Sequence, residues 1–278
     1  MSETEATGRY VHGTEPEEQK RLARHNDLIN RRSLSAMRLS AGERVLDVGS
    51  GLGQMSRAMA RAVGPNGRVV GVERSPEQIA RGQEFARAAG EEWLADIRQG
   101  DATALPLRSE EWGTFDVAHA RFLLEHVPDP LAVVRGMVRA VRPGVRIVLE
   151  DDDHDVFRMW PEVPEAWAVW QAYLATYERL GLDANIGRRL IEILHQAGAT
   201  PVRNDGLFFG CCAGDPDFTA YVDNVVGILV GARGDILATG RVDEKAHARG
   251  IAALSEWQRR PEASLWYTAA WAEGRRPS

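Results

Sequence analysis

The sequence lacks the features that mark secreted, membrane-spanning and disulfide-stabilised proteins. It has only two cysteines, Cys211 and Cys212, and adjacent cysteines cannot close an ordinary disulfide without strained geometry. No apolar run is long enough to span a membrane, and the first residues combine neither a basic start nor an apolar stretch. We therefore expect a cytoplasmic protein without a membrane partner, whose cysteines are ordinary packing residues.

An excess of positive charge is also missing. The formal net charge is -6 and the sequence pI is about 5.7, so the chain has no overall positive field of the kind that nucleic-acid-binding proteins carry. The arginines between Arg21 and Arg38 alternate with apolar residues at near-helical spacing; these are Leu22, Leu28, Ile29, Leu34 and Met37. This pattern predicts an amphipathic helix with a solvated charged face, and we expect no nucleic-acid partner.

Internal repeats and low-complexity linkers are absent, which favours one domain with appendages. The chain also has no Gly-x-Ser-x-Gly nucleophile elbow and no zinc-ligand spacing. With 278 residues, of which 44% are hydrophobic, it can bury a full α/β core.

The most informative stretch that is present covers residues 45–53. An apolar run there ends in the acid Asp47, and glycines then occupy alternate positions: Gly49, Gly51 and Gly53. The apolar residues suit a buried parallel strand, the glycines allow positive φ, and the helix that follows has free N-terminal amides. We expect a nucleotide-like ligand at this turn.

The glycine spacing separates two kinds of ligand. A dinucleotide fingerprint, G-x-G-x-x-G, needs its third glycine where Gln54 stands, so a pyrophosphate site fits poorly. An acid two residues before the first glycine, here Asp47, can serve an ammonium group that NAD lacks. The pattern resembles motif I of the class I S-adenosylmethionine-dependent methyltransferases, in which the loop wraps the methionine half of the cofactor.

Two further segments resemble the parts of these enzymes that bind the adenosine half of the cofactor. Residues 68–73 form a strand pattern that ends at Glu73, 20 residues after Gly53, where a carboxylate can accept both ribose hydroxyls. Residues 97–106 resemble the family's G-D-A segment, which implies that Asp101 takes the adenine amino group and that the following amide reaches a ring nitrogen.

Two more segments follow in the expected order. Residues 115–130 lead from a strand into a helical turn beneath the methionine end, and residues 141–150 are close to the family's L-R-P-G-G. The resemblance is specific over residues 40–150 and points to the small-molecule, quinone-methyltransferase-like branch.

The alternation of strand and helix over residues 41–150 predicts an α/β fold. We expect a doubly wound, mostly parallel seven-stranded sheet of the Rossmann-like methyltransferase type, with an N-terminal helix and helical lid insertions. The chain is divided into an N-terminal helical extension, 1–40, and a methyltransferase domain, 41–278, with lid insertions at about 151–184 and 214–260.

The segment after residue 150 is rich in aromatic residues. A helix near 162–181 would present one stripe of large side chains, made by Trp160, Trp167, Trp170, Leu174 and Tyr177. Such a stripe is more often core than pocket. In similar enzymes, however, an insertion at this point covers the active-site mouth, so part of the stripe can face a hydrophobic acceptor. The final strands are expected at 201–212 and 264–272, with helices between them.

The cofactor site follows from strand ends and from the resemblance. Asp47, Glu73 and Asp101 fall at or just beyond the carboxyl ends of predicted strands, where ligands bind in such sheets. The residues predicted to bind S-adenosylmethionine, or its product S-adenosylhomocysteine, are Tyr10, Asp47, Gly49, Ser50, Gly51, Gly53, Gln54, Glu73, Arg74, Asp101, Ala102 and Arg121. Tyr10 begins a Tyr-x-x-Gly-x-x-x-Glu segment that lies over the cofactor in similar enzymes; a packing role for Tyr10 is nearly as well supported.

Methyl transfer from a sulfonium needs little beyond alignment, because the cofactor carries the activated group. An acceptor hydroxyl or acidic carbon still benefits from a base, and His154 and His126 are the candidates, with a structural role as the stronger alternative for each. His119 is expected in the packing of the sheet. The acids at 150–155 suggest a Mg²⁺ or Ca²⁺ site, but consecutive strand residues point to opposite faces, so no metal is predicted.

The leading hypothesis is a methyltransferase that acts on O, N or C of a small, partly apolar metabolite in secondary metabolism. A quinone-type ring C-methyltransferase is a close alternative. A protein that binds the cofactor without methylation, such as a cyclase or a regulatory module, is a different class. A nicotinamide oxidoreductase is disfavoured by Gln54. Whether the chain forms a homo-oligomer stays open.

Overall fold

The computed structural model describes residues 29–278, of which 29–37 are helical. The described part of this first helix is amphipathic as predicted, with Ile29 and Met37 fully buried and Arg31 and Arg32 exposed. Tyr10 and most of the predicted N-terminal extension lie outside the described residues.

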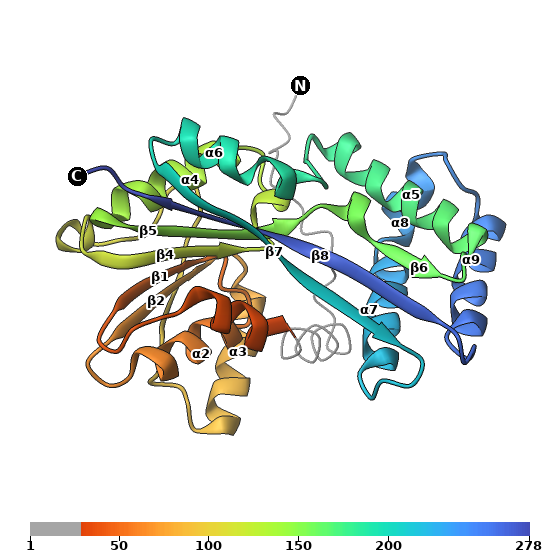
Figure 1. Ribbon diagram of the computed structural model, residues 1–278, viewed down its shortest axis with the longest axis horizontal. Helices are drawn as coiled ribbons and strands as arrows, with labels where there is room; N and C mark the ends of the chain where they lie inside the picture. Colours follow the sequence, from red (N-terminus) through yellow and green to blue (C-terminus); the bar gives the residue numbers. More distant parts are fainter. Residues whose placement is uncertain (1–28) are drawn as a thin grey trace.

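The centre of the fold is one open sheet of eight strands (Figure 1). Five of them are parallel, in the order β3-β2-β1-β4-β5. Their bounds are β1 (Arg44–Val48), β2 (Arg68–Glu73), β3 (Asp96–Gln99), β4 (Phe115–Arg121) and β5 (Val141–Asp152). The short apolar runs in β1, β2 and β4 are buried on both faces, as strands in the middle of a parallel sheet must be.

The remaining strands are antiparallel. β8 (Ser264–Arg275) pairs with β5 on one edge and with β7 (Thr200–Cys212) along the other, and β6 (Arg158–Trp160) continues the β5 edge of β8. This confirms the predicted doubly wound, mostly parallel sheet and its final two strands. The structure adds the three-residue strand β6 to the seven that were expected.

Helices cover both faces of the parallel part (Figure 1). α4 (Pro130–Ala140) and α6 (Leu190–Gln196) pack on one face, in a core that includes Leu46 and Val48 of β1. α2 (Gln54–Val63) and the helical residues 29–37 pack on the other face, against Val45. The side chains of β1 thus alternate between two cores, which is the period-two pattern of a strand. α3 (Pro76–Ala89) follows β2 on the α2 side.

A second group of helices lies beyond the parallel strands, over the extended ends of β7 and β8 (Figure 1). It consists of α5 (Pro164–Leu180), α7 (Phe218–Gly231), α8 (Arg233–Ala238) and α9 (Glu244–Trp257). Together with β6 they enclose an apolar core of their own, which we call the lid core. No helix within residues 29–278 combines the length and the apolar character needed to cross a bilayer.

The aromatic stripe predicted for residues 160–177 is partly wrong. Trp170 and Tyr177 are buried in the lid core, and Trp167 packs against it. Trp160, however, lies in β6 and is 58% exposed. The helix begins only at Pro164, whose missing N–H is tolerated in a first turn but not within a helix, so Trp160 cannot join the stripe.

Within residues 29–278, four short 3₁₀ helices complete the fold: η1 (Ser109–Glu111), η2 (Leu124–His126), η3 (His154–Val156) and η4 (Ile186–Arg189). η4 continues directly into α6, so residues 186–196 form a 3₁₀ turn followed by a short α-helix. No helix forms between the end of β3 and η1, and Asp101 lies in this connection.

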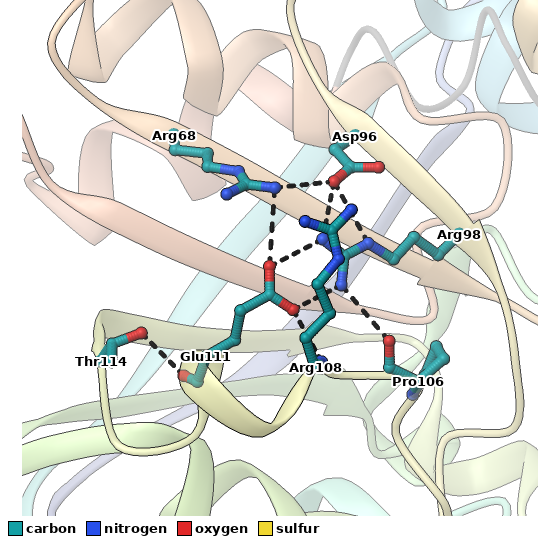
Figure 2. A network of polar contacts seen from close by, with 7 residues as sticks. All are labelled: Arg68, Asp96, Arg98, Pro106, Arg108, Glu111 and Thr114. Carbon is teal, nitrogen blue, oxygen red and sulfur yellow. Dashed lines mark hydrogen bonds and ion pairs between the residues drawn. The ribbon is translucent and has the colours of Figure 1, made fainter.

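An ion-pair network holds η1 against the edge of the sheet (Figure 2). Arg98 of β3 binds both carboxylate oxygens of Glu111, at 2.6 and 2.8 Å, and Asp96 at 2.7 Å. Arg68 of β2 reaches Asp96 at 3.0 Å and Glu111 at 3.5 Å. Glu111 is only 3% exposed, and its bidentate bond to Arg98 lowers its pKa to about 2. The network fixes both ends of the connection that carries Asp101.

Candidate active site

The glycine turn after β1 has the backbone that the sequence predicted. Gly49, Gly51 and Gly53 all have positive φ, of 79°, 52° and 68°. A Cβ on Gly49 would lie 2.9 Å from a methyl carbon of Leu123, so the turn needs glycine for space as well as for conformation. α2 starts directly after Gly53 without a side-chain cap, which leaves its first amides available to a ligand.

Asp47 is already engaged by protein groups. One carboxylate oxygen lies 2.8 Å from Nδ1 of His119 and the other accepts a hydrogen bond from the Ser56 hydroxyl. Asp47 is 3% exposed and His119 is fully buried, yet both border the cavity described below. The expectation that His119 serves sheet packing thus overlooked its bond to Asp47. Only the strand register reveals this bond, because Asp47 and His119 are far apart in sequence but are direct neighbours on β1 and β4.

Glu73 and Asp101 lie at the ends of the next two strands. The Glu73 carboxylate accepts the amide N–H of Gly51 at 2.9 Å and that of Ser75 at 2.9 Å, so its position is fixed relative to the glycine turn. Asp101 accepts the amide and the hydroxyl of Thr103, at 2.7 and 2.5 Å, and these bonds lower its pKa. Both side chains are therefore oriented before any ligand binds.

One cavity of about 270 Å³ joins almost all the predicted site residues. Those that line it are Asp47, Gly49, Ser50, Gly51, Gln54, Glu73, Arg74, Asp101, Ala102, Arg121, His126 and His154. Gly53 borders a neighbouring cavity on the other side of the turn. Residues from the ends of β1, β2, β4 and β5 thus meet at the carboxyl edge of the sheet, where open α/β sheets bind ligands.

The same cavity continues into the lid core, and we call this part the lid half. Its walls are aromatic: Phe157, Trp170, Tyr173, Tyr221 and Tyr267. Tyr267 comes from β8, and the others come from the segment before β6, from α5 and from α7. The sequence predicted that part of the α5 stripe could face an acceptor, and Trp170 does line the cavity. Tyr221 and Tyr267 were missed because nothing local to them signals a pocket.

His154 and His126 both lie beside the same buried acid, Glu125. His154 Nε2 is 2.9 Å from Oε2 of Glu125, and His126 Nε2 is 3.4 Å from its Oε1. Tyr177 also hydrogen-bonds Glu125, and Tyr173 lies 2.8 Å from the Tyr177 hydroxyl. Burial raises the pKa of Glu125 to about 8 and lowers that of His154. Sequence reasoning named both histidines but missed the acid that joins them.

The acids at the end of β5 and directly after it diverge as expected, with one exception. Asp151 accepts the amides of Leu123 and Leu124, at 3.2 and 2.7 Å, and Asp153 and Asp155 pair with Arg188. Asp152 instead borders the cavity, and ligand-type atoms of Asp152, Glu125 and His154 lie within 4.8 Å of one another. Glu125 comes from η2, far from residues 150–155 in sequence, so local spacing could not predict that these three side chains meet. The expectation that no metal binds stays a prediction.

Comparison with known proteins gives a family. The sequence model of a family described as "Methyltransferase domain" matches residues 39–198, more than half of the chain. Demethylmenaquinone methyltransferase from Bacillus cytotoxicus is 35% identical over 116 residues, 42% of this chain and 47% of that protein. The chain spans about half the length of the curated relatives it matches.

Two solved structures share the fold. Phosphoethanolamine N-methyltransferase 2 from Haemonchus contortus, in complex with S-adenosylhomocysteine, has a TM-score of 0.54 at 15% identity. The superposition includes 90% of this chain and 52% of that enzyme. The [4+2]-cyclase SpnF has a TM-score of 0.53 at 22% identity and covers 91% of this chain and 81% of its own.

Proposed function

The chain belongs to the class I S-adenosylmethionine-dependent methyltransferase family, and we propose that it transfers a methyl group to O, N or C of a small, partly apolar metabolite of secondary metabolism. Family membership confirms the predicted resemblance and the predicted cofactor. The observation that supports a bound acceptor is that one cavity continues from the glycine turn to the aromatic lid half. A cofactor and an acceptor can meet in it without solvent between them.

The proposed cofactor contacts follow the strand ends. Glu73 would hold the ribose hydroxyls, Asp101 and Ala102 the adenine, and the glycine turn the methionine half. Asp47 would act on the methionine ammonium group either directly or through the groups it binds. Since the sulfonium is already activated, these residues contribute by alignment of the methyl group with the acceptor atom.

We propose His154 as the base for an acceptor proton, oriented by Glu125. Its Nε2 is engaged by the carboxylate, while the imidazole lies at the cavity wall among aromatic rings, 5.5 Å from that of Trp170. Its lowered pKa keeps the ring neutral near pH 7, the form that accepts a proton. His126 stacks on Tyr177 at 5.8 Å and shares Glu125, which favours a supporting role.

Two alternatives have specific support. The demethylmenaquinone methyltransferase relative favours a quinone-type ring carbon, but the match covers only 42% of the chain. The likeness to SpnF fits a cyclase that uses the same fold without methyl transfer. In either case, the lid insertions at about 151–184 and 214–260 would enclose the acceptor. We further propose a cytoplasmic location and no nucleic-acid partner, in line with the net charge of -6.

The first experiment is calorimetric titration with S-adenosylmethionine, S-adenosylhomocysteine and NAD in parallel. Saturable binding of the two adenosyl ligands without NAD supports the proposal. Methyl incorporation from labelled cofactor into a panel of small acceptors then separates a methyltransferase from a cyclase. Preference for NAD, or no adenosyl binding by folded protein, would refute the assignment.

A further inference from the structure

Glu125 and Asp151 are buried, and the neighbouring Asp152 is partly buried and borders the cavity. Glu125 is satisfied by His154, His126 and Tyr177. Asp151 is satisfied by backbone amides. The carboxylate of Asp152 accepts no hydrogen bond from the residues that the structure describes, although it borders the cavity.

The charges around Asp152 are unbalanced. Among the described residues, His154 is the one group that can bring a positive charge to it, and only when its ring is protonated, whereas Glu125, Asp151 and Glu150 act in the opposite direction. No arginine or lysine contributes, whereas Asp153 and Asp155 share Arg188. Burial, with these like charges, raises the pKa of Asp152 to about 8. The cavity thus holds a desolvated acid that a cation would stabilise.

The walls beside this acid suit an organic cation. The rings of Phe157, Trp170 and Tyr173 lie in sequence against one another, with centroids 4.7 and 5.4 Å apart. Tyr221 and Tyr267 provide two further rings of the same cavity, 6.5 Å apart. Aromatic faces attract ammonium groups, and most strongly where water is excluded.

Two polar atoms of the residues that form these walls have no partner within residues 29–278. The indole N–H of Trp170, in a side chain that is 4% exposed, has no hydrogen-bond partner among the described residues. The buried hydroxyl of Tyr267 has none either. Both atoms lie behind the cavity surface rather than on it, so they do not themselves identify the ligand.

We propose that the methyl acceptor is a small organic amine, bound as its ammonium form against Asp152 and the aromatic walls, and methylated on nitrogen. This inference rests on the proposed methyltransferase function and narrows it from O, N or C to N. The Asp152 carboxylate holds the ammonium group, and the N–H proton passes to His154, whose ring lies beside Asp152. The freed lone pair then attacks the methyl carbon, the C–S bond breaks with its electron pair left on sulfur, and N-methylammonium and S-adenosylhomocysteine result.

The electrostatics disfavour an oxygen nucleophile. The surroundings that raise the pKa of Asp152 and Glu125 disfavour an anion, so they would also disfavour an alkoxide or phenolate, whereas an amine acceptor is a cation before and after the transfer. A divalent metal would reverse this balance. It is the weaker interpretation, because Glu125 and His154 already bond each other at 2.9 Å and would have to separate to coordinate an ion.

The test is calorimetry on protein saturated with S-adenosylhomocysteine. The probes are tyramine, benzylamine and ethanolamine, each paired with the alcohol in which a hydroxyl replaces the amino group. We expect at least one amine to bind tenfold or more tightly than its alcohol. Asp152→Asn should abolish that difference, while Asp155→Asn, which removes an exposed acid paired with Arg188, should keep it.

The outcomes separate this inference from the proposed function. Alcohols that bind as well as the amines in every pair would overturn it, and so would Mn²⁺ binding that is lost in both Asp152→Asn and Glu125→Gln. Failure to bind S-adenosylhomocysteine would instead overturn the proposed function. Because Asp152→Asn removes an acid that lies beside other acids, the melting temperature of this variant should not fall below that of the wild type. A loss of amine binding could then not be attributed to unfolding.

Discussion

Replacement of Glu73 by alanine should weaken S-adenosylmethionine binding strongly while leaving the fold intact. Glu73 ends β2 and borders the cavity, with its carboxylate fixed by the amides of Gly51 and Ser75 at 2.9 Å each. A charge-assisted hydrogen bond to a ligand contributes about 1.5–3 kcal/mol. At 1.36 kcal/mol for each factor of ten, the dissociation constant should rise about 10- to 160-fold.

The assay is calorimetric titration of both variants and wild type with S-adenosylmethionine at one salt concentration, with urea unfolding as the check on stability. Glu73→Gln should fall between wild type and Glu73→Ala, because one amide oxygen remains but the NH₂ group faces a backbone N–H. Glu77→Ala is the matched control, since Glu77 lies in the first turn of α3 and is exposed. An affinity for Glu73→Ala within twofold of the wild type would show that the ribose does not bind here.

Three further changes probe the turn, the sheet edge and the base. Gly49→Ala should lower the free energy of unfolding by about 1–3 kcal/mol and abolish cofactor binding, because φ is 79° and the new methyl meets Leu123; urea unfolding and calorimetry test this. Glu111→Gln should lower the free energy of unfolding at pH 7 by about 1–3 kcal/mol, as measured by urea unfolding. The pKa of Glu111 in the folded protein, about 2, lies below its ordinary value of 4.5, so the stabilisation is complete above pH 4.5 and is lost as the pH falls toward 2. The difference between the variant and the wild type should therefore vanish near pH 2. His154→Gln should lower kcat about 10²- to 10⁴-fold with cofactor affinity unchanged, and an unaltered kcat would exclude the histidine as base.

The cofactor side of the protein was predictable from sequence because its signals are local. Alternate glycines after an apolar strand require a turn of positive φ, and the structure has it at Gly49, Gly51 and Gly53. Glu73 and Asp101 could be placed because parallel strands bring their carboxyl ends to one edge. Chain spacing and strand direction were sufficient to define this half of the cavity.

The acceptor side was predictable only in outline. A helical insertion after β5 was expected, but Trp160 was placed in the wrong element. The spacing of aromatic residues does not show where a helix begins, and here the helix begins only at Pro164. Glu125, Asp152 and Tyr267 come from three separate elements, η2, β5 and β8, and nothing in their local sequence links them.

The sequence by itself therefore determined the strand–turn–helix units, the mostly parallel character of the sheet and the family to which the chain belongs, because each depends on motifs, conformational preferences and periodicity that can be read along the chain. Tertiary structure alone decided which acid lies between His154 and His126, which carboxylate is left without a partner, and which rings enclose it. These properties depend on the long-range packing of the lid helices against β5 and β8, where burial removes water and raises the pKa of Asp152.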